Sequence, residues 1–276
     1  MVDTDLNKNE IIKYEKSYVA FLDVLGFKNL VFSNRKESKE KLNEYFESIQ
    51  IIIAYLKQIP IKKEIGYITI SDSIILTVPQ SNNRSENIEI LRQLCIAIGF
   101  LQAGLAARDI WIRGAVSSGD TYFNKNNNQI VGPAYINAYL LEENLAIYPR
   151  VIIDNKIIEE LNFVSSNDLI DNINKKSEGY LDLNNCGKTI LYDWENSQIE
   201  KDIPLFIDYL SFCVNDKKSL NTFNLGEKIL DNIEKNIYNN TSLYKKFKWV
   251  SSYFSSIIEN KDEVNLKIHL ERIKNL

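Results

Sequence analysis

The sequence predicts an α/β fold of the α+β kind, with a ferredoxin-like β-α-β-β-α-β core, an enlarged antiparallel sheet and a C-terminal helical extension. Three observations support this prediction: apolar runs of strand length, long segments with helical periodicity between them, and a tight turn joining two of the runs. The chain has 276 residues, of which 45% are hydrophobic and 25% charged, so it can bury a sizeable core as one large domain or as one domain with an extension.

The first elements follow one another at short intervals. Residues 17–24 form an apolar run with β-branched and aromatic side chains, which is typical of a buried strand. Apolar residues over 29–56 recur mostly with a helical period and predict a helix. Residues 65–70 and 73–78 then indicate two strands of a tight hairpin with Asp72 at its tip.

A second helix and further strands complete the predicted sheet. Residues 86–107 favour a helix and 110–117 return as a strand, which gives an antiparallel sheet with both helices on one face. A third helix is predicted from about 133 to 146. We divide the chain into a main domain, 17–214, and a helical extension packed on it, 215–276. The short strands that would enlarge the sheet are 149–153, 180–183, 189–194 and 204–212.

Composition and charge exclude several classes of partner. The formal charge of −4 and the pI near 5.3 provide no basic surface, so we expect no nucleic-acid partner. Cys95, Cys186 and Cys213 form no CxxC pair, which argues against a disulfide framework and a structural zinc site. The most apolar stretch, 94–107, is too short to span a membrane, and residues 1–16 lack the apolar core of a signal peptide. We therefore expect a cytoplasmic protein with reduced thiols and no membrane segment.

Histidine chemistry is excluded in the main domain because the only histidine is His269, close to the C-terminus. A Ser-His-Asp or Cys-His site, a histidine-ligated zinc and a histidine general base all require one. Any chemistry must therefore depend on carboxylates, a metal, lysine, arginine or tyrosine.

Two aspartates interrupt otherwise apolar runs. Asp23 stands near the end of the first predicted strand, just before Gly26 and Phe27, and Asp72 stands at the tip of the predicted hairpin. An aspartate in such a run is costly to desolvate unless it is neutralised, hydrogen-bonded or bound to a cation. Either one alone is explained as well by a cap or bend at a strand end, but together they indicate a divalent-metal site.

This layout resembles the class III nucleotide cyclase family, which has a first metal aspartate in an F-x-D-x-x-G-F stretch and a second in a hairpin several tens of residues later. The resemblance implies two Mg²⁺ or Mn²⁺ ions, held by Asp23, Asp72 and the main-chain carbonyl of Val24 over a nucleoside triphosphate. Gly26 and Phe27, at the start of the first helix, would contact the substrate phosphates. The resemblance also implies a head-to-tail homodimer with two sites at its interface.

Later segments match the family more loosely. Residues 112–119 resemble its strand leading to a small-residue turn, and 132–142 resemble its G-x-x-x-N-x-A-x-R-L-E helix. In that frame, Ile136 and Leu140 occupy the places of the transition-state asparagine and arginine. Arg113 or Arg150 would then meet the charge on the pentavalent phosphorus.

The base-reading positions depart from the adenylate and guanylate cyclase pattern. Ile68 stands where those enzymes carry lysine or glutamate, Gln129 stands at the partner position, and Tyr67 lies next to Ile68 as a second candidate reader of the base. With the segments 148–150 and 206–210, the chain looks most like the pyrimidine cyclases of the bacterial Pycsar anti-phage systems. This resemblance implies conversion of CTP or UTP to cCMP or cUMP and pyrophosphate, with a separate effector that the product activates.

Two other readings of the sequence stay open. Loss of both transition-state residues is compatible with a degenerate cyclase fold that senses a nucleotide or only dimerises. A palm-type nucleotidyl transferase shares the strand order and the two carboxylates. Its diguanylate version is disfavoured, because the hairpin lacks the G-G-D/E-E-F sequence.

Overall fold

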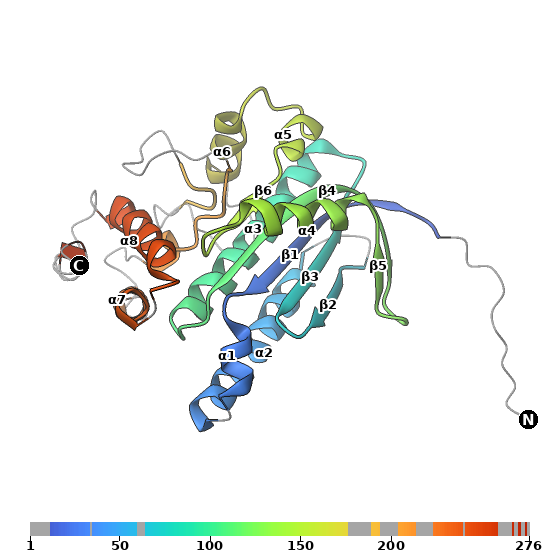
Figure 1. Cartoon of the computed structure of the whole chain (residues 1–276). Helices are drawn as coiled ribbons and strands as arrows, with labels where there is room; N and C mark the ends of the chain where they lie inside the picture. Colours follow the sequence, from blue (N-terminus) through green and yellow to red (C-terminus); the bar gives the residue numbers. More distant parts are fainter. Residues whose placement is uncertain are drawn as a thin grey trace, which may run out of the picture.

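A six-stranded sheet forms the central layer of the computed structural model (Figure 1). The structure describes residues 12–33, 35–59, 64–175, 189–193, 204–213, 223–239, 241–258 and the single positions 267, 270, 271 and 274. The strands are β1 Glu15–Val24, β2 Gly66–Ile70, β3 Ser73–Pro79, β4 Ile112–Asn124, β5 Gln129–Val131 and β6 Val151–Ile153. The α-helices are α1 Phe27–Phe32, α2 Lys36–Leu56, α3 Arg84–Ala106, α4 Pro133–Leu145, α5 Lys156–Glu160, α6 Ser166–Lys175, α7 Phe223–Asn239 and α8 Tyr244–Ile258.

The strand order confirms the predicted core. The sheet runs β2-β3-β1-β4-β5, and β1 pairs antiparallel with both β3 and β4. β2 pairs antiparallel with β3, as a β-α-β-β-α-β unit requires. The enlargement of the sheet is not purely antiparallel, because β6 pairs parallel with β4. The chain crosses back through α4 before it enters β6, and such a crossover is what a parallel neighbour needs.

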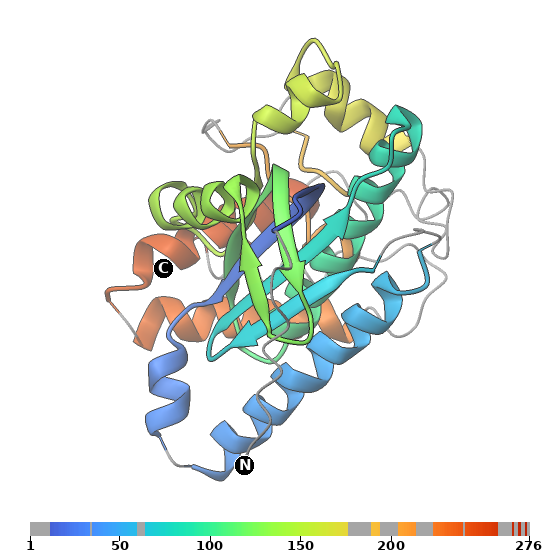
Figure 2. The same cartoon turned by 90° about the vertical axis from the view of Figure 1, so that its right-hand side faces the viewer.

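Helices cover both faces of the sheet (Figures 1 and 2). α2 and α3 share the larger hydrophobic core with the inward residues of β1, among them Leu22 and Val24. α4 lies on the opposite face, where Ala134 and Ala138 pack against Phe21. Because side chains alternate along a strand, Asp23 lies on the same face as Phe21, beneath α4.

Two elements differ from the sequence prediction in their extent. The helix predicted over 29–56 is divided into α1 and α2, since Ser33 ends the first and Arg35, in an extended conformation, precedes the second. The strand predicted over 110–117 continues to the end of β4, and the asparagine run after it forms the turn of a β4–β5 hairpin. Asn128 in that turn has a φ of 49°, a left-handed conformation that asparagine tolerates better than most residues.

The strands predicted after β6 are much reduced. Residues 180–183 lie outside the described part of the chain. Among the described residues, 189–193 and 204–213 pair as strands only at the isolated bridge Leu191↔Ile207, and a second bridge joins Phe206 to Ile152. The strand predicted over 204–212 is therefore wrong in its length: the N–H and the hydroxyl of Ser211 donate to the Asp208 carboxylate, and Ser211–Cys213 form a 3₁₀ helix.

The two C-terminal helices pack on the rest of the protein. Asn232 of α7 donates a hydrogen bond from Nδ2 to the carbonyl of Ala106 at the end of α3, at 2.9 Å. Phe247 of α8 meets the ring of Trp111 edge-on, with centroids 4.9 Å apart. These contacts attach α7 to the end of α3 and α8 to the residue that precedes β4.

α3 is the one helix in the described residues that is long and apolar enough, by length and composition, to cross a membrane. This helix has 23 residues and is longer than the apolar stretch 94–107 noted in the sequence. Of its most apolar 18-residue segment, 83% is buried inside the protein. Burial raises the pKa of its thiol, Cys95, to about 12, and Cys213 is a second buried free thiol. Cys186 and His269 lie outside the described residues.

Asp109 joins three parts of the fold at the turn between α3 and β4. It accepts hydrogen bonds from Trp111 Nε1 at 3.0 Å, Asn236 Nδ2 at 2.6 Å and Lys235 Nζ at 2.9 Å, and it forms an ion pair with Lys41 at 3.4 Å. Burial alone would raise the pKa of Asp109, but these hydrogen bonds and charges outweigh it and hold the pKa below its usual value.

We expect Asp109→Asn to lower the free energy of unfolding at pH 7 by about 1–3 kcal/mol, because the amide loses the charge that the two lysines face. Asparagine keeps the left-handed backbone of this turn, where φ is 59°. Since the folded-state pKa is depressed, the stabilisation is present at pH values above about 4 and is lost as the pH falls through the folded value. Urea unfolding of both proteins between pH 7 and pH 3 should show their difference shrinking at the acid end; a constant difference would contradict this role.

Candidate active site

The two aspartates predicted from sequence lie together at one end of the sheet. Asp23 is opposite Ser73 in the β1–β3 pairing, directly beside the turn that carries Asp72. The N–H of Val24 donates to the main-chain carbonyl of Asp72 at 3.2 Å, which fastens the hairpin tip to the end of β1. Burial raises the pKa of Asp23, and the negative charge of Asp72 raises it further. The two carboxylates are thus electrostatic neighbours.

The turn after β1 is held from both sides. The N–H of Leu25 donates to the carbonyl of Trp111 at 2.7 Å, and Gly26 adopts a φ of 74°, which favours glycine. Phe27 begins α1 with its ring buried against Tyr45, at a centroid distance of 5.8 Å. Its side chain therefore anchors the turn in the core, and a contact with substrate phosphates would come from the first N–H groups of α1, which have no partner within that helix.

Arg113 is the candidate arginine that lies with the aspartates. It is opposite Asp23 in the β1–β4 pairing, and its Nε is 3.5 Å from Asp23 Oδ2. The same Nε is 2.8 Å from Glu142 Oε1, which α4 brings down onto the sheet. Arg113 therefore stands between two carboxylates, with its side chain 24% exposed.

Glu142 is a member of the site that the sequence did not identify as functional. Its side chain is almost fully buried, and burial raises its pKa to about 6, with the charge of Asp23 adding to the effect and Arg113 opposing it. The sequence signal was weak, because a Leu-Glu pair near the end of a helix occurs commonly without a role. Glu142 orients Arg113 and keeps it beside Asp23.

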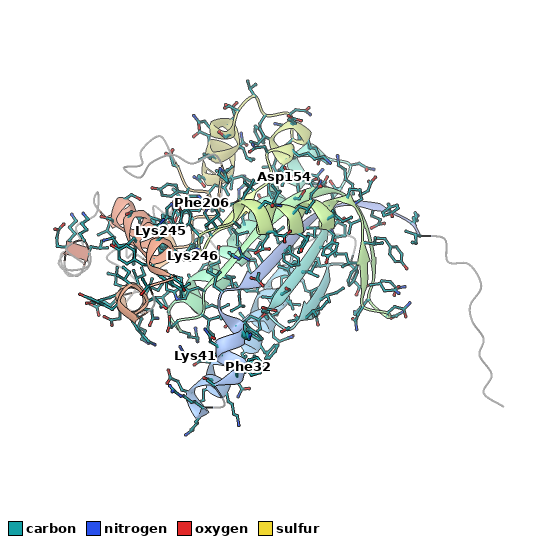
Figure 3. The ribbon with its side chains drawn as sticks, in the orientation of Figure 1. Phe32, Lys41, Asp154, Phe206, Lys245 and Lys246 are labelled. Carbon is teal, nitrogen blue, oxygen red and sulfur yellow. The ribbon has the colours of Figure 1, made fainter. Side chains whose placement is uncertain are left out.

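Lys246 of α8 is a second member that the sequence did not reveal. Burial lowers its pKa and the charge of Arg113 lowers it further, while Asp23 and Glu142 act in the opposite direction. Its position next to Lys245 on α8 is seen in Figure 3. Nothing in a Lys-Lys pair indicates that one member faces a site formed more than a hundred residues earlier in the chain.

Arg150, the other candidate arginine, is placed differently. Arg150 is only 2% exposed. Its guanidinium lies 5.4 Å from the ring centres of Tyr148 and Phe206 and 4.9 Å from that of Trp249. An arginine enclosed by three rings does not present its planar fork to a substrate phosphate. The structure brings Arg113 to the two aspartates and places Arg150 in this aromatic cluster.

Within a single chain, neither of the two candidate base readers, Tyr67 and Gln129, lies beside Asp23. Tyr67 packs against the core of the opposite face, where Lys57 Nζ lies 5.6 Å from its ring centre. Ile68 is on the α4 face instead. Gln129 pairs with Asn124, which is eleven residues beyond Arg113 on β4, a separation of about 35 Å along a strand. Gln129 could reach a site of this kind only on another copy of the chain.

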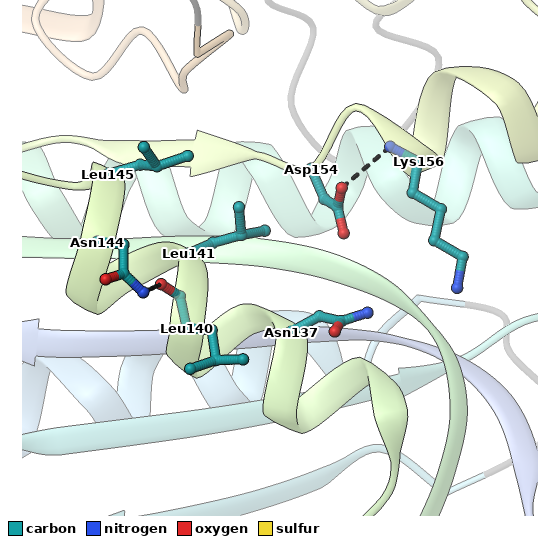
Figure 4. Close-up of a pocket in the computed structure, with 7 residues that line it drawn as sticks. All are labelled: Asn137, Leu140, Leu141, Asn144, Leu145, Asp154 and Lys156. Carbon is teal, nitrogen blue, oxygen red and sulfur yellow. Dashed lines mark hydrogen bonds between the residues drawn. The ribbon is translucent and has the colours of Figure 1, made fainter.

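The positions of the two missing transition-state residues are exposed on α4. Ile136 is 50% and Leu140 is 44% exposed. A groove of about 510 Å³ lies beside the same helix, next to the segment that joins β6 to α5 (Figure 4). It contains none of the charged residues around Asp23. Its lining residues are Asn137, Leu140, Leu141, Asn144, Leu145, Asp154 and Lys156.

The residues around Asp23 fit a divalent cation in their donor chemistry. Asp23 and Asp72 are two half-buried carboxylates, and Mg²⁺ typically uses one or two carboxylates together with water and substrate phosphate oxygens. The buried hydroxyl of Tyr45, whose pKa is raised by burial and then by the charges of Asp72 and Asp23, has no hydrogen-bond partner among the described residues. Within the same residues no group of three or more His, Cys, Asp or Glu side chains could hold a metal by itself, so water, a main-chain carbonyl and substrate oxygens would complete the coordination.

Comparisons with known proteins give structural similarities only. No family model and no curated protein sequence matches the chain. The adenylyl cyclase CyaB from P. aeruginosa is similar with a TM-score of 0.43 and 14% identity, over 71% of this chain and 93% of that one. The catalytic core of a rhodopsin-guanylyl cyclase with converted specificity is similar with a TM-score of 0.40 and 16% identity, over 53% of this chain and 80% of that one. The guanylyl cyclase domain of the RhoGC fusion protein from Blastocladiella emersonii is similar with a TM-score of 0.39 and 15% identity, over 53% of this chain and 86% of that one.

Proposed function

We propose that the chain is a nucleotide cyclase of the class III type, which converts a ribonucleoside triphosphate to its 3′,5′-cyclic monophosphate and pyrophosphate. The observation that carries this proposal is the convergence of Asp23, Asp72 and Arg113 at one end of the sheet, next to the turn at Gly26. Two carboxylates beside an arginine are costly in a structural role, because the carboxylates repel each other and each is partly desolvated. They are well suited to hold a triphosphate with its cations.

Asp23, Asp72 and the main-chain carbonyl of Val24 would hold two Mg²⁺ or Mn²⁺ ions. When bound, these ions supply charge neutralisation for the triphosphate and activation of the ribose 3′-hydroxyl. In the reaction, the 3′ oxygen forms a bond to the α-phosphorus, the bond from that phosphorus to the β-phosphate oxygen breaks, and the hydroxyl proton is released.

The chain's own residues would position the substrate and stabilise its charge. Arg113 faces the carboxylate pair and could donate to an α-phosphate oxygen, as the absent family arginine would. Glu142 keeps the Arg113 side chain in place through the 2.8 Å ion pair. The first N–H groups of α1, after Gly26, would contact the outer phosphates.

A pyrimidine base, in CTP or UTP, is the substrate we propose. The support is chemical: Ile68, at the position expected to read a purine, is apolar and 7% exposed on the α4 face, so it offers no charge or hydrogen bond to a purine edge. Gln129, exposed at the far end of the β4–β5 hairpin, could donate to and accept from a base bound to a second copy of the chain.

We further propose that two copies assemble head to tail, so that each completes the other's site. Exposed apolar residues on β5 and α4 support this, because such residues are available for an interface: Val131, Ile136, Tyr139 and Leu140 are 39–50% exposed. The cyclic product would then act as a second messenger on a separate effector, in anti-phage defence, as the sequence resemblance implies.

The test is incubation of the purified protein with each of the four ribonucleoside triphosphates and Mg²⁺ or Mn²⁺, with products separated by chromatography. We expect a cyclic pyrimidine monophosphate and an equal amount of pyrophosphate. A cyclic purine product would keep the reaction type and overturn the substrate. Absence of any product, with retained triphosphate binding, would instead support a nucleotide sensor.

A further inference from the structure

Lys246 brings a positive charge from the C-terminal helices to the edge of the carboxylate site. Phe247, the next residue, packs on Trp111, and the Trp111 carbonyl accepts from the Leu25 N–H two residues after Asp23, which brings this part of α8 to the carboxylate site although α8 follows β4 by more than a hundred residues. The charges of Arg113, Asp23 and Glu142 act on the pKa of Lys246. Lys246 is half-buried and forms no hydrogen bond or ion pair with any residue that the structure describes. A partly desolvated ammonium group without a protein partner favours binding of an anionic ligand.

The position of α8 is fixed by two aromatic contacts just after Lys246. Phe247, the next residue, packs edge-on against Trp111, whose carbonyl in turn holds the Leu25 N–H. Two residues further, Trp249 stacks on Tyr148 with centroids 4.7 Å apart and with a 4° angle between the rings. The backbone of Lys246 is thus held by aromatic contacts, while its four-carbon side chain keeps the freedom to follow a ligand.

The charged groups Arg113, Asp23 and Glu142 already form ion pairs within the site. Arg113 is engaged by Asp23 and Glu142, so part of its charge is neutralised before any substrate arrives. A nucleoside triphosphate carries its largest negative charge on the β- and γ-phosphates, which become pyrophosphate. Lys246 is the site cation that no described carboxylate pairs with within 4.0 Å.

We propose that Lys246 binds the β- and γ-phosphates of the substrate and the pyrophosphate product, so that the C-terminal helical extension completes the active site. This assignment rests on the proposed function and deepens it. The neighbouring Lys245 is exposed and provides a matched control, a lysine at the adjacent position of the same helix (Figure 3).

The experiment is calorimetric titration of the full-length protein with inorganic pyrophosphate in the presence of Mg²⁺, for the wild type, Lys246→Met, Lys246→Arg and Lys245→Met. We expect Lys246→Met to weaken pyrophosphate binding about 10- to 100-fold, the range of one charge-assisted hydrogen bond. Lys246→Arg should restore most of the affinity, and Lys245→Met should stay within about 2-fold of the wild type.

Two results would overturn the assignment: equal affinities of Lys246→Met and wild type, or no pyrophosphate binding by the wild type. Thermal unfolding of each variant shows whether the fold is kept, and Lys246→Arg keeps the test decisive if methionine disturbs α8. Because the readout is binding, it separates this inference from the cyclase proposal. A protein that binds pyrophosphate through Lys246 and makes no cyclic nucleotide would retain the phosphate site and lose the proposed reaction.

Discussion

Asp72→Asn is expected to lower cyclase turnover by at least about 10³-fold while leaving the fold intact. Asparagine keeps the shape of the side chain and removes the charge that, with Asp23, would hold the cations. Loss of several kcal/mol of charge stabilisation corresponds to a rate effect of this size. The measurement is the initial rate of cyclic nucleotide formation, with far-ultraviolet circular dichroism as the check on folding.

Stability should move in the opposite direction to activity in this variant. Asp72 adds to the raised pKa of Asp23, so its charge is unfavourable to its neighbour in the absence of a cation. We therefore expect the unfolding free energy of Asp72→Asn without metal to equal or exceed that of the wild type. Asp120→Asn, an exposed aspartate on β4, is the matched control and should change neither quantity. Turnover of Asp72→Asn within about 10-fold of the wild type would contradict a catalytic role for this carboxylate.

Asp208→Ala is expected to lower the free energy of unfolding by about 3–5 kcal/mol. Asp208 is 1% exposed and accepts hydrogen bonds from the Tyr253 hydroxyl at 2.6 Å, from Ser211 Oγ at 2.8 Å and from the Ser211 N–H at 3.1 Å, with Thr189 Oγ1 as a fourth donor. Burial raises its pKa despite these bonds. Alanine would leave several buried donors without an acceptor, and urea unfolding measures the cost.

Asp208→Asn is the matched control, because it keeps one acceptor oxygen and the shape of the side chain. It should cost less than half as much as alanine, since hydroxyl groups can rotate to accept from the amide. If both substitutions cost equally little, the cluster around Asp208 would not be what fixes α8. Because Tyr253 lies on α8, Asp208→Ala should also weaken any binding that depends on Lys246.

The sequence predicted the parts of the site that depend on local signals. An aspartate inside a strand-like run and another between two such runs place Asp23 and Asp72 without knowledge of tertiary packing, and the antiparallel pairing of β1 with β3 then brings them together. Arg113 was found as one of two candidate arginines. Local sequence could not choose between them, because the aromatic cluster around Arg150 depends on Trp249, about a hundred residues away.

The direction of side chains on a strand and the packing of distant segments explain which features of the site and sheet the sequence did not predict. Tyr67 and Ile68 are neighbours on one strand, so one of them must point away from Asp23, and alternation counted from Asp72 cannot be carried across a turn. Glu142 and Lys246 join the site only because α4 and α8 pack where they do. The added parallel strand β6 was likewise read as antiparallel, since its partner is set by the α4 crossover.

The packing of α8 against Trp111 also sets an order of events during protein synthesis. Strands β1 to β3, with both aspartates, leave the ribosome roughly 170 residues before Lys246, which at 5–20 residues per second is roughly 10–35 s earlier. During that interval a nascent chain can form the hairpin and the turn, but Trp111, Tyr148 and Phe206, once translated, have no α8 to cover them. Each new molecule therefore depends on α8, which is translated after the sheet, to shield this aromatic surface from solvent and from other unfinished chains.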